Sequence, residues 1–285
     1  MPEITGKTPL FGLIGHPVRH SISPTLHNAW FRHHGIDGMY AALPTREPAG
    51  DILTALTTLG VSGVNVTVPL KRDMLPLVDA LDEDATLTGA INTLVRDGRD
   101  WVGHNTDVAG FSAALAELGV DPHGARVAVL GAGGAALGVA AALLRAGAEG
   151  VVLYNRDEAK AHRLAARLGG AVCGGPLTTL GFSALTPDLV VNALPGAARE
   201  RVRALPIDHL PQTTAWVDLN YWDPEPPHLQ TLRARGHRVQ TGHLMLLHQA
   251  ALAFARFTGV SPAIEVGRAL LPRQSAAMVT EPAGM

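Results

Sequence analysis

The chain has 285 residues, of which 47% are apolar and 17% charged, and its formal net charge is −2. That length suits two domains, and the apolar fraction is sufficient for substantial hydrophobic cores. A nearly neutral chain gives no electrostatic reason to expect binding to nucleic acid or to an anionic membrane surface. The single cysteine, Cys173, excludes an intramolecular disulfide and a cysteine-based metal cluster.

Targeting and membrane signals are also missing from the sequence. No apolar run approaches about 18 residues free of glycine and charge, so we expect no membrane span. The first residues, MPEITGKTP, lack the basic start and apolar core of a secretory signal. We therefore expect a soluble, cytoplasmic protein.

Two serines stand near the start of the first predicted helix. Leu10–Ile14 is typical of a strand, and a break follows it. Ser23 and Pro24 predict an N-cap followed by proline at the first helical position, with the helix running to about His34. Ser21 and Ser23 would combine hydroxyl donors with free backbone amides, which suits a carboxylate. In the simpler alternative, Ser23 is only a cap and Ser21 only a loop residue.

A second group of polar residues follows a predicted strand. The segment Val61–Leu70 alternates valines at 64, 66 and 68 with polar residues, which predicts one apolar and one polar face. Pro69 ends this strand and Lys71 opens a helix. Asn65, Thr67 and Lys71 therefore gather at one strand end, where ligands bind in open α/β sheets. The alternative is a half-exposed strand followed by a solvated lysine.

A predicted hairpin and a helix start come next. The short strands Gly89–Val95 and Asp100–Gly103 flank an Asp-Gly pair, which favours a hairpin turn. Asp107 then opens a helix over Val108–Leu118, and a carboxylate in the first helical turn is electrostatically favourable. Asp107 is a candidate acidic group, although acidic residues at helix starts are common.

The segment from 125 to 157 has the order strand, glycine-rich turn, helix, strand. Arg126–Leu130 is a short apolar run, the turn Gly131–Ala136 fits G-x-G-x-x-A, and Val151–Tyr154 is the second strand. This order distinguishes a dinucleotide fingerprint from a glycine-rich turn in some other α/β domain. Gly131 would permit the tight turn, Gly133 would let a pyrophosphate approach the backbone, and the helix N-terminus would supply amide donors.

The end of the second strand indicates which dinucleotide is bound. Asn155 stands where an NAD-binding unit usually carries an acidic residue for the ribose 2′-hydroxyl. Arg156 and Lys160 are cationic and suit a 2′-phosphate, which points to NADP. Asp157 argues against it by repulsion, and the two cations are also compatible with ordinary surface charge.

The remaining elements complete the predicted fold. Strands over Leu189–Val191 and Trp216–Leu219 extend a doubly wound sheet. A long apolar helix follows over Gly242–Phe257, and Gln249 within it can both donate and accept. We expect disorder from Pro272 onward.

Five histidines lie between His16 and His34, which raises the question of a metal site. His16 and His20 have i, i+4 spacing, but Pro17 prevents them from sharing a helix face. The sequence contains no HExxH pattern, so we expect no metal.

Taken together, these segments resemble the shikimate dehydrogenase (shikimate/quinate dehydrogenase) family. The motifs are GHPVRHSISPTLHN, GVNVTVPLK, GAINT, GHNTD, GAGGAA, NRD and GHLMLLHQA, spread in order over about residues 10–257. The resemblance implies an α/β fold of two domains separated by a cleft. An N-terminal substrate-binding domain would comprise residues 1–106 with 242–285, and a Rossmann-type NADP-binding domain residues 107–241. It also implies an oxidoreductase acting on CH–OH groups, which reversibly reduces 3-dehydroshikimate to shikimate with NADPH in aromatic amino-acid biosynthesis.

The resemblance further implies roles for individual residues. Lys71 and Asp107 would be the catalytic pair and would also contact the substrate. The other residues implied to bind the substrate are Ser21, Ser23, Asn65, Thr67, Asn92, Tyr221 and Gln249. Those implied to bind NADP are Gly131, Ala132, Gly133, Gly134, Ala135, Asn155, Arg156, Lys160, Asn192, Ala193, Leu219, Gly242 and Met245. An ammonium beside the ketone would stabilise the alkoxide and deliver a proton, a contribution of about 10²–10⁴-fold in rate.

Two departures from the family pattern leave alternatives open. The family usually has Asn-Arg-Thr where this chain has Asp157 in third place, and Asn-Ala-Thr where it has Leu194. A quinate/shikimate dehydrogenase with relaxed use of NAD and NADP, or a non-catalytic NADP-binding sensor, is an alternative. The paired serines and Asp107 argue against a methylene-tetrahydrofolate dehydrogenase. We expect a monomer or homodimer with a small-molecule substrate and no nucleic-acid or membrane partner.

Overall fold

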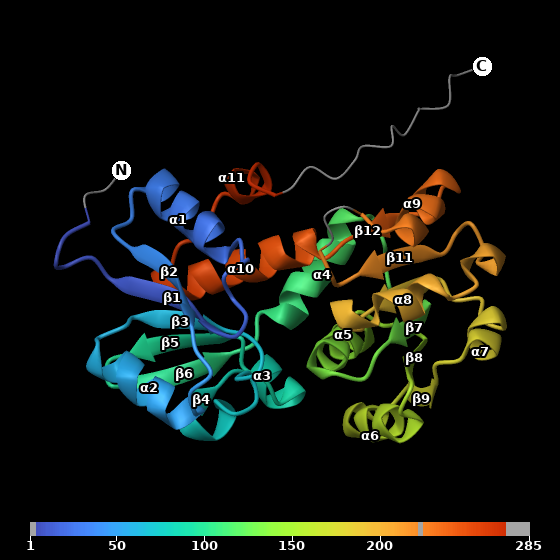
Figure 1. Ribbon diagram of the computed structural model, residues 1–285, viewed down its shortest axis with the longest axis horizontal. Coiled ribbons are helices and arrows are strands. Elements are labelled where there is room, and N and C mark those ends of the chain that lie inside the picture. The colour runs from blue at the N-terminus through green and yellow to red at the C-terminus, as the bar shows by residue number, and fades with distance from the viewer. Residues whose placement is uncertain (1–3, 222–224, 272–285) are drawn as a thin grey trace, which may run out of the picture. The chain divides into compact units, whose positions relative to one another are not determined.

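The computed structural model describes residues 4–221 and 225–271 (Figure 1). The disorder expected from Pro272 onward falls outside this part of the chain. The chain divides into two compact units. The first contains residues up to 117, together with 134–145 and 244–270, and the second contains 118–133 and 146–243.

The first unit is built on a mixed sheet that has six strands in the described residues. In spatial order these are β2 (Met39–Pro44), β1 (Leu10–Gly15), β3 (Gly63–Val66), β5 (Thr93–Asp97), β6 (Asp100–His104) and β4 (Ala80–Leu81). Strand β1 pairs in parallel with β2 and β3, whereas β5 is antiparallel to both of its neighbours. The hairpin predicted around Asp97-Gly98 is confirmed, because β5 and β6 pair directly through Asp97 and Asp100.

The first unit also contains helices, some of which pack against one another through aromatic side chains. They are α1 (Ser23–His34), α2 (Ala49–Thr58), α3 (Glu83–Thr88), α4 (Asp107–Glu117), α5 (Gly134–Arg145), α10 (His243–Thr258) and α11 (Ile264–Arg268), with a 3₁₀ turn at Leu75–Leu77. Trp30 and Phe31 of α1 pack against Phe254 of α10, with ring centroids 5.6 and 5.0 Å away. This contact places α10 beside α1 (Figure 1). Arg145, the last residue of α5, donates to Glu83 of α3 at 3.0 Å.

Two expectations for this unit were wrong. Strand β3 ends at Val66 and is buried along its whole length, so it has no solvated polar face. Val68, expected on the apolar face, is 59% exposed. The alternation failed because Asn65 is polar but buried in a network of hydrogen bonds, as described below. Lys71 opens no helix either, and lies in a turn over residues 68–74.

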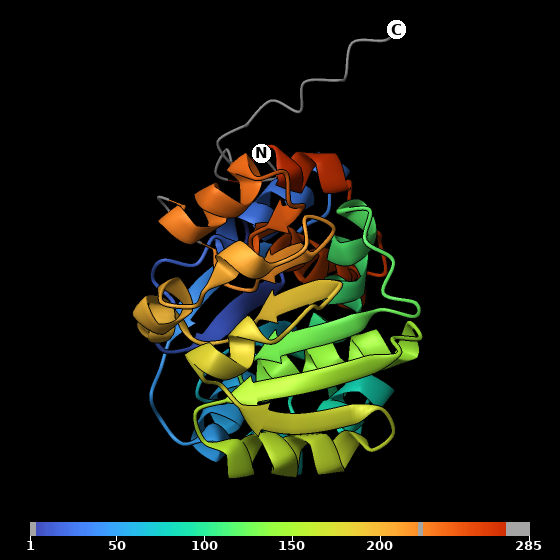
Figure 2. The ribbon, with the colours of Figure 1, turned by 90° about the vertical axis from the view of Figure 1, so that its right-hand side faces the viewer.

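The second unit contains a fully parallel sheet among its described strands. The order is β12 (Val239–Gln240), β11 (Ala215–Asp218), β10 (Leu189–Asn192), β7 (Arg126–Leu130), β8 (Gly150–Asn155) and β9 (Val172–Pro176). Strands β7 to β10 lie side by side and point the same way (Figure 2). The predicted doubly wound α/β arrangement is confirmed, and the strand order reverses between β10 and β7.

The helices of the second unit are short apart from α6. They are α6 (Glu158–Leu168), α7 (Thr179–Ser183), α8 (Arg199–Arg203) and α9 (Pro227–Ala234), with 3₁₀ turns at Gly196–Ala198 and Ile207–His209. Trp216, Leu229 and Leu232 form the centre of a buried cluster on one face of the sheet. Over the described part of the chain, no helix is both long and apolar enough to cross a membrane.

Candidate active site

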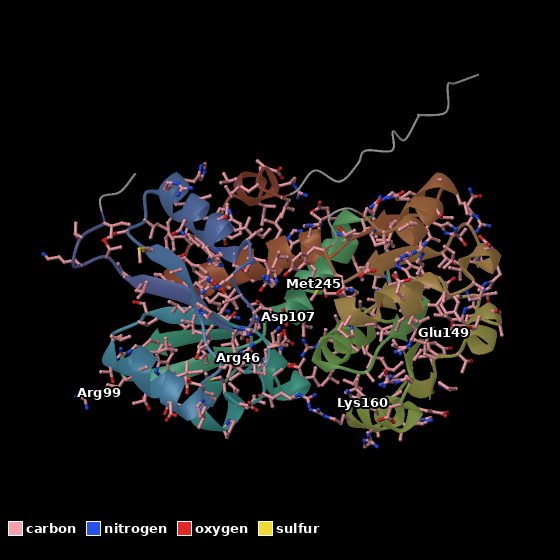
Figure 3. The ribbon with its side chains drawn as sticks, in the orientation of Figure 1. Arg46, Arg99, Asp107, Glu149, Lys160 and Met245 are labelled. Carbon is pink, nitrogen blue, oxygen red and sulfur yellow. The ribbon has the colours of Figure 1, made fainter. Side chains whose placement is uncertain are left out.

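A lysine and an aspartate from distant parts of the sequence form an ion pair in the first unit. Lys71 Nζ lies 2.6 Å from Asp107 Oδ2. Asp107 is the first residue of α4 (Figure 3), and Lys71 lies in the turn after β3. The Lys71 carbonyl accepts from the Ile91 N–H at 2.8 Å, which fixes the backbone of the turn. The side chains keep 28% and 20% of their exposure, so a small molecule can reach both charges.

Asn92 orients the carboxylate of this pair. Its Nδ2 donates to Asp107 Oδ1 at 2.8 Å and to Thr106 Oγ1 at 2.9 Å, and its Oδ1 accepts from the Thr106 N–H at 2.8 Å. The two oxygens of Asp107 therefore have different partners, one an amide and the other an ammonium. This arrangement holds the lysine in one position while leaving its remaining protons free to be donated.

Gln249 reaches the same group from α10. Its Oε1 lies 3.4 Å from Asn92 Nδ2, and its Nε2 donates to the Leu246 carbonyl at 2.9 Å. Helices α4 and α10 approach closely here because Gly110 has no side chain. A Cβ at Gly110 would lie 2.8 Å from the Cβ of Gln249.

Asn65 is linked to the pair through Asn92. It is only 6% exposed, and its Nδ2 donates to Thr93 Oγ1 at 3.0 Å and to the Asn92 carbonyl at 3.2 Å. Its Oδ1 accepts from the Tyr40 hydroxyl at 2.8 Å. Burial raises the pKa of Tyr40 well above its ordinary value, so the hydroxyl stays protonated and remains a donor. Thr67 is half-buried just past the end of β3.

The two serines are linked to each other. The Ser21 hydroxyl donates to Ser23 Oγ at 3.1 Å and accepts from the Ser23 N–H at 3.2 Å. The prediction that Ser23 is an N-cap was wrong, because α1 begins at Ser23 and the capping position is Ile22, without a side-chain cap bond. The Ser23 hydroxyl bonds to its neighbour instead of to a backbone amide of the first turn.

The glycine-rich turn after β7 has the geometry of a phosphate cradle. Gly131 adopts a φ of +122°, and a Cβ there would lie 3.0 Å from the Ala193 carbonyl oxygen. Cβ atoms at Gly133 and Gly134 would meet nothing within 4 Å, so the backbone is open to a ligand at both residues. The start of α5 follows directly, which places free amide donors at the same point. These residues fit a dinucleotide pyrophosphate.

Asp157, which follows β8 and whose charge disfavours NADP, forms a hydrogen bond within the protein. Asp157 is the N-cap of α6, and its Oδ1 accepts from the Lys160 N–H at 3.0 Å. Its Oδ2 lies 3.9 Å from the Arg163 guanidinium. Arg156 and Lys160 are exposed, and Figure 3 shows Lys160 on α6.

The other predicted NADP residues lie in the second unit or at its chain boundary. Asn192 is 1% exposed, and Ala193 follows it after β10. Gly242 packs against the backbone so tightly that a Cβ would lie 2.2 Å from the Leu219 oxygen. Met245 is half-buried in the first turns of α10 (Figure 3). Tyr221 is 43% exposed, with its ring centroid 5.6 Å from that of His243. Among the residues that the structure describes, no group of three or more metal-ligating side chains occurs.

Comparison with known proteins identifies the family. Residues 13–94 match the shikimate dehydrogenase substrate binding domain, 113–219 match shikimate / quinate 5-dehydrogenase, and 242–271 match the shikimate 5′-dehydrogenase C-terminal domain. A shikimate dehydrogenase (NADP(+)) of Moorella thermoacetica is 41% identical over 271 residues, covering 91% of each chain. One of Rubrobacter xylanophilus is 41% identical, covering 95% of this chain and 98% of its own. The chain belongs to the shikimate dehydrogenase family.

Solved structures of the family have the same fold. Shikimate 5-dehydrogenase from Thermus thermophilus in complex with NADP(H) and shikimate gives a TM-score of 0.79 at 35% identity, covering 92% of this chain and all of that one. Quinate dehydrogenase from Corynebacterium glutamicum in complex with NAD gives 0.82 at 31% identity, covering 92% and 98%. The predicted family and fold class are therefore confirmed, whereas the roles of individual residues stay predictions.

Several residues around the shikimate dehydrogenase motifs were not singled out from the sequence. Asn105 Oδ1 accepts from the Asp107 N–H at 2.9 Å, and its Nδ2 donates to the Ala90 carbonyl at 2.9 Å. Asn105 and Thr106 stand inside GHNTD, so their place next to Asp107 was a usable signal. Thr93 stands inside GAINT, so its place next to Asn92 was also a usable signal, whereas Tyr40 lies outside all of the motifs and gave none.

A carboxylate outside the motifs supports this segment. Asp82 accepts from His104 Nδ1 at 3.1 Å, from the Ala85 N–H at 2.8 Å and from the Asn105 N–H at 3.3 Å. Burial acts to raise the pKa of Asp82, but these hydrogen bonds outweigh it and hold the pKa below its ordinary value of 3.8. Asp82 therefore stays ionised and ties the start of α3 to the residues that precede Asp107.

Proposed function

We propose that this member of the family is an NADP-dependent shikimate dehydrogenase that reversibly reduces 3-dehydroshikimate to shikimate. The observation that carries the proposal is the contact of 2.6 Å between Lys71 Nζ and Asp107 Oδ2, with Asn92 on the other carboxylate oxygen. A non-catalytic NADP-binding sensor has no need of such an oriented, accessible pair. The paired charges therefore favour an enzyme.

The proposed chemistry needs one proton to move at one oxygen atom. Bound NADP(H) supplies the hydride exchange with the substrate carbon. During reduction, the Lys71 ammonium donates a proton to the oxygen that becomes the hydroxyl, and during oxidation the neutral amine accepts it. Asp107 holds Nζ in place through both directions and lowers the entropic cost of positioning it.

The other predicted substrate residues supply donors and acceptors for a polyhydroxylated acid. We assign the substrate carboxylate to the hydroxyls of Ser21 and Ser23, which are adjacent at the start of α1. Asn92, Gln249 and Thr67 would bind hydroxyls near Lys71. Tyr221 is also predicted to contact the substrate. Asn65 is buried and bonded to Tyr40 and Thr93, so its amide would act on the substrate chiefly by fixing Asn92.

For NADP, the cradle at Gly131–Ala135 would bind the pyrophosphate. Arg156 and Lys160, with Asn155, would bind the 2′-phosphate. On this proposal, residues 1–106 with 242–285 form the substrate-binding domain and 107–241 the cofactor-binding domain. Helices α4 and α5 then belong by chain order to the second domain, although they pack within the first compact unit. We further propose a cytoplasmic enzyme that is a monomer or homodimer, with no nucleic-acid or membrane partner.

Asp157 favours a second candidate function, a quinate/shikimate dehydrogenase that uses NAD as well as NADP. The experiment that tests both is the nicotinamide absorbance change with shikimate and with quinate, each with NADP⁺ and with NAD⁺. Turnover of shikimate with NADP⁺ alone supports the first proposal. Comparable rates with NAD⁺ or quinate support the second, and a protein without turnover in all four assays contradicts both.

A further inference from the structure

A carboxylate is completely buried at the end of β11. Asp218 is 0% exposed, and its Oδ2 accepts from Asn192 Nδ2 at 2.8 Å. Its Oδ1 accepts from the N–H and from Nδ2 of Asn220, both at 2.9 Å. Within the described residues, no lysine or arginine forms an ion pair with it, and His228 Nε2 lies 3.9 Å away. Burying a charged group is expensive unless it is fully hydrogen-bonded, so this carboxylate has a specific structural task.

Its three donors belong to two loops that follow neighbouring strands. Asn192 ends β10, and its Oδ1 accepts from the Leu194 N–H at 3.2 Å. Asn220 follows β11, and its Nδ2 also donates to the Leu194 carbonyl at 3.0 Å. The Leu219 N–H donates to the Asn192 carbonyl at 2.9 Å. Asp218 therefore joins the loop after β10 to the loop after β11.

A third segment is fixed by the second of these loops. The Gly242 N–H donates to the Asn220 carbonyl at 2.9 Å, and a Cβ at Gly242 would overlap the Leu219 carbonyl. The three segments brought together carry Ala193, Leu219 and Gly242, which the family resemblance implies bind NADP.

The sheet topology indicates which end of NADP these loops face. In a doubly wound sheet a dinucleotide lies across the carboxyl ends of the strands, with one nucleotide on each side of the switch point. Here the switch point lies between β7 and β10. The cradle after β7 and Arg156 after β8 occupy the adenosine side, so the loops after β10 and β11 face the nicotinamide.

We propose that Asp218 is a positioning residue for the nicotinamide of NADP. Its buried carboxylate fixes the loops after β10 and β11 against each other and, through Asn220, against Gly242. This inference rests on the proposed function, because it takes NADP as the ligand of these loops. The loops contact the cofactor, and Asp218 acts through them without touching it.

The test uses a reciprocal exchange at positions 192 and 218. In Asp218→Asn, an amide donor faces one of the existing donors, and in Asn192→Asp two buried carboxylates face each other. In the double variant, the amide introduced at 218 donates to the carboxylate introduced at 192. That carboxylate still accepts from the Leu194 N–H, and the Asn220 donors keep an acceptor. The single variants break the network, and the double variant restores every bond with nearly unchanged volume.

For each variant, kcat, the KM for NADP⁺ and for shikimate, the NADPH affinity by nicotinamide fluorescence, and the melting temperature are measured. We expect each single variant to lose between about 10- and 100-fold in kcat/KM for NADP⁺, with an unchanged KM for shikimate. The double variant should recover most of this loss. Asp188→Asn is the matched control. Asp188 lies directly before β10, at the end of the strand opposite to Asn192, and its carboxylate accepts from the Arg126 N–H at 2.9 Å.

Asn220→Ala is a milder second variant, since it removes the bridge from Asp218 to Leu194 but keeps the backbone donor. It should weaken NADPH binding and leave the KM for shikimate unchanged. If the single exchanges do not fold, this variant alone tests whether Asp218 positions the nicotinamide loops. The proposal is overturned if Asn220→Ala binds NADPH like the wild type, or if a folded double variant is as impaired as a folded single one. A wild type that binds NADPH but does not oxidise shikimate would refute the proposed function alone, because NADPH affinity still tests this inference.

Discussion

Replacing Lys71 by alanine gives the sharpest test of the proposed catalytic pair. The change removes the ammonium that lies 2.6 Å from Asp107 Oδ2 and leaves the bond from Asn92 to Asp107 Oδ1 in place. Loss of a general acid lowers kcat by about 10²–10⁴-fold, which corresponds to about 2.7–5.4 kcal/mol in the activation barrier. We expect the KM for NADP⁺ to stay unchanged, because Lys71 lies outside the predicted cofactor residues.

The stability of the same variant should change far less than its rate. The two side chains retain 28% and 20% of their exposure, so solvent screens the pair. Its removal is expected to change the free energy of unfolding by no more than about 1 kcal/mol. In a chain of this size, that is a shift of only about 2–4 °C in melting temperature. A large loss of rate without a large loss of stability is therefore the signature of a catalytic role.

The assay is the initial rate of nicotinamide reduction with shikimate and NADP⁺, together with a thermal melt of each protein. Lys7→Ala is the control, because Lys7 is an exposed lysine outside the site. Asp107→Asn, alone and combined with Lys71→Ala, tests whether the two residues act as a unit. If they do, the double variant should be about as slow as the slower of the two single variants. A Lys71→Ala enzyme within about threefold of the wild-type rate would refute the assignment of Lys71 as the proton donor, since a general acid contributes at least about 10²-fold.

Three further predictions concern the cofactor loops and the support of Asp107. Gly133→Ala should leave the melting temperature unchanged, because a Cβ there meets nothing within 4 Å. It should raise the KM for NADP⁺ about tenfold or more through lost phosphate hydrogen bonds. Gly50→Ala, at an equally open glycine of α2, is the control and should leave this KM unchanged. If Gly133→Ala and the wild type have the same KM for NADP⁺, the assignment of this turn as a phosphate cradle is contradicted. Asp157→Thr should raise the ratio of kcat/KM for NADP⁺ over NAD⁺, because it removes a negative charge near the 2′-phosphate and keeps a side chain able to cap α6; an unchanged ratio would mean that the cap holds the carboxylate away from the phosphate. Asp82→Asn should lower the free energy of unfolding near neutral pH. Because the folded pKa of Asp82 is below 3.8, its stabilisation is complete above that value and is lost as the pH falls through the folded pKa. In urea titrations, the difference in the free energy of unfolding between the variant and the wild type should therefore shrink below about pH 3.8. A difference that stays constant with pH would argue against a stabilising ionised Asp82.

The sequence predicted the second unit better than the first. Strands such as β7 and β8 are short apolar runs between glycine-rich turns, and their order alone specifies the doubly wound sheet. Strand β3 of the mixed sheet misled the same reasoning. Its polar Asn65 was expected on a polar face with Thr67 and Lys71, at a strand end where ligands bind. Instead, Tyr40 of β2 and Thr93 of the adjacent β5 bind its amide in the interior. The periodicity of a sequence shows which positions are polar, but it does not show whether a hydrogen-bond partner for a polar side chain lies in the protein interior.

The residues of the proposed catalytic pair could be singled out from the sequence, but their contact could not be predicted from it. Lys71 and Asp107 are 36 positions apart, and only the paired strands β3, β5 and β6 bring the two segments together. The role of Asp218 had no signal in the sequence, because an aspartate at a strand end usually binds a ligand or solvent. Its partners Asn192 and Asn220 come from separate loops, so only the folded chain reveals that they converge on it.

Buried asparagines at or next to the ends of strands make the same kind of contact at three places in the chain. Asn92, Asn105 and Asn192 each use the carbonyl oxygen as an acceptor and the amide as a donor to a second segment. An aspartate would offer only acceptors and a leucine would offer neither, so either would leave a backbone group or a carboxylate unpaired in the interior. An asparagine can therefore bind a carboxylate without adding a charge of its own, as Asn92 does for Asp107 and Asn192 does for Asp218. The same kind of contact thus orients a partly exposed aspartate beside Lys71 and a fully buried one between the loops after β10 and β11. The difference in exposure matches the two roles that we propose, since Asp107 would hold a group that a substrate can reach and Asp218 would fix a loop.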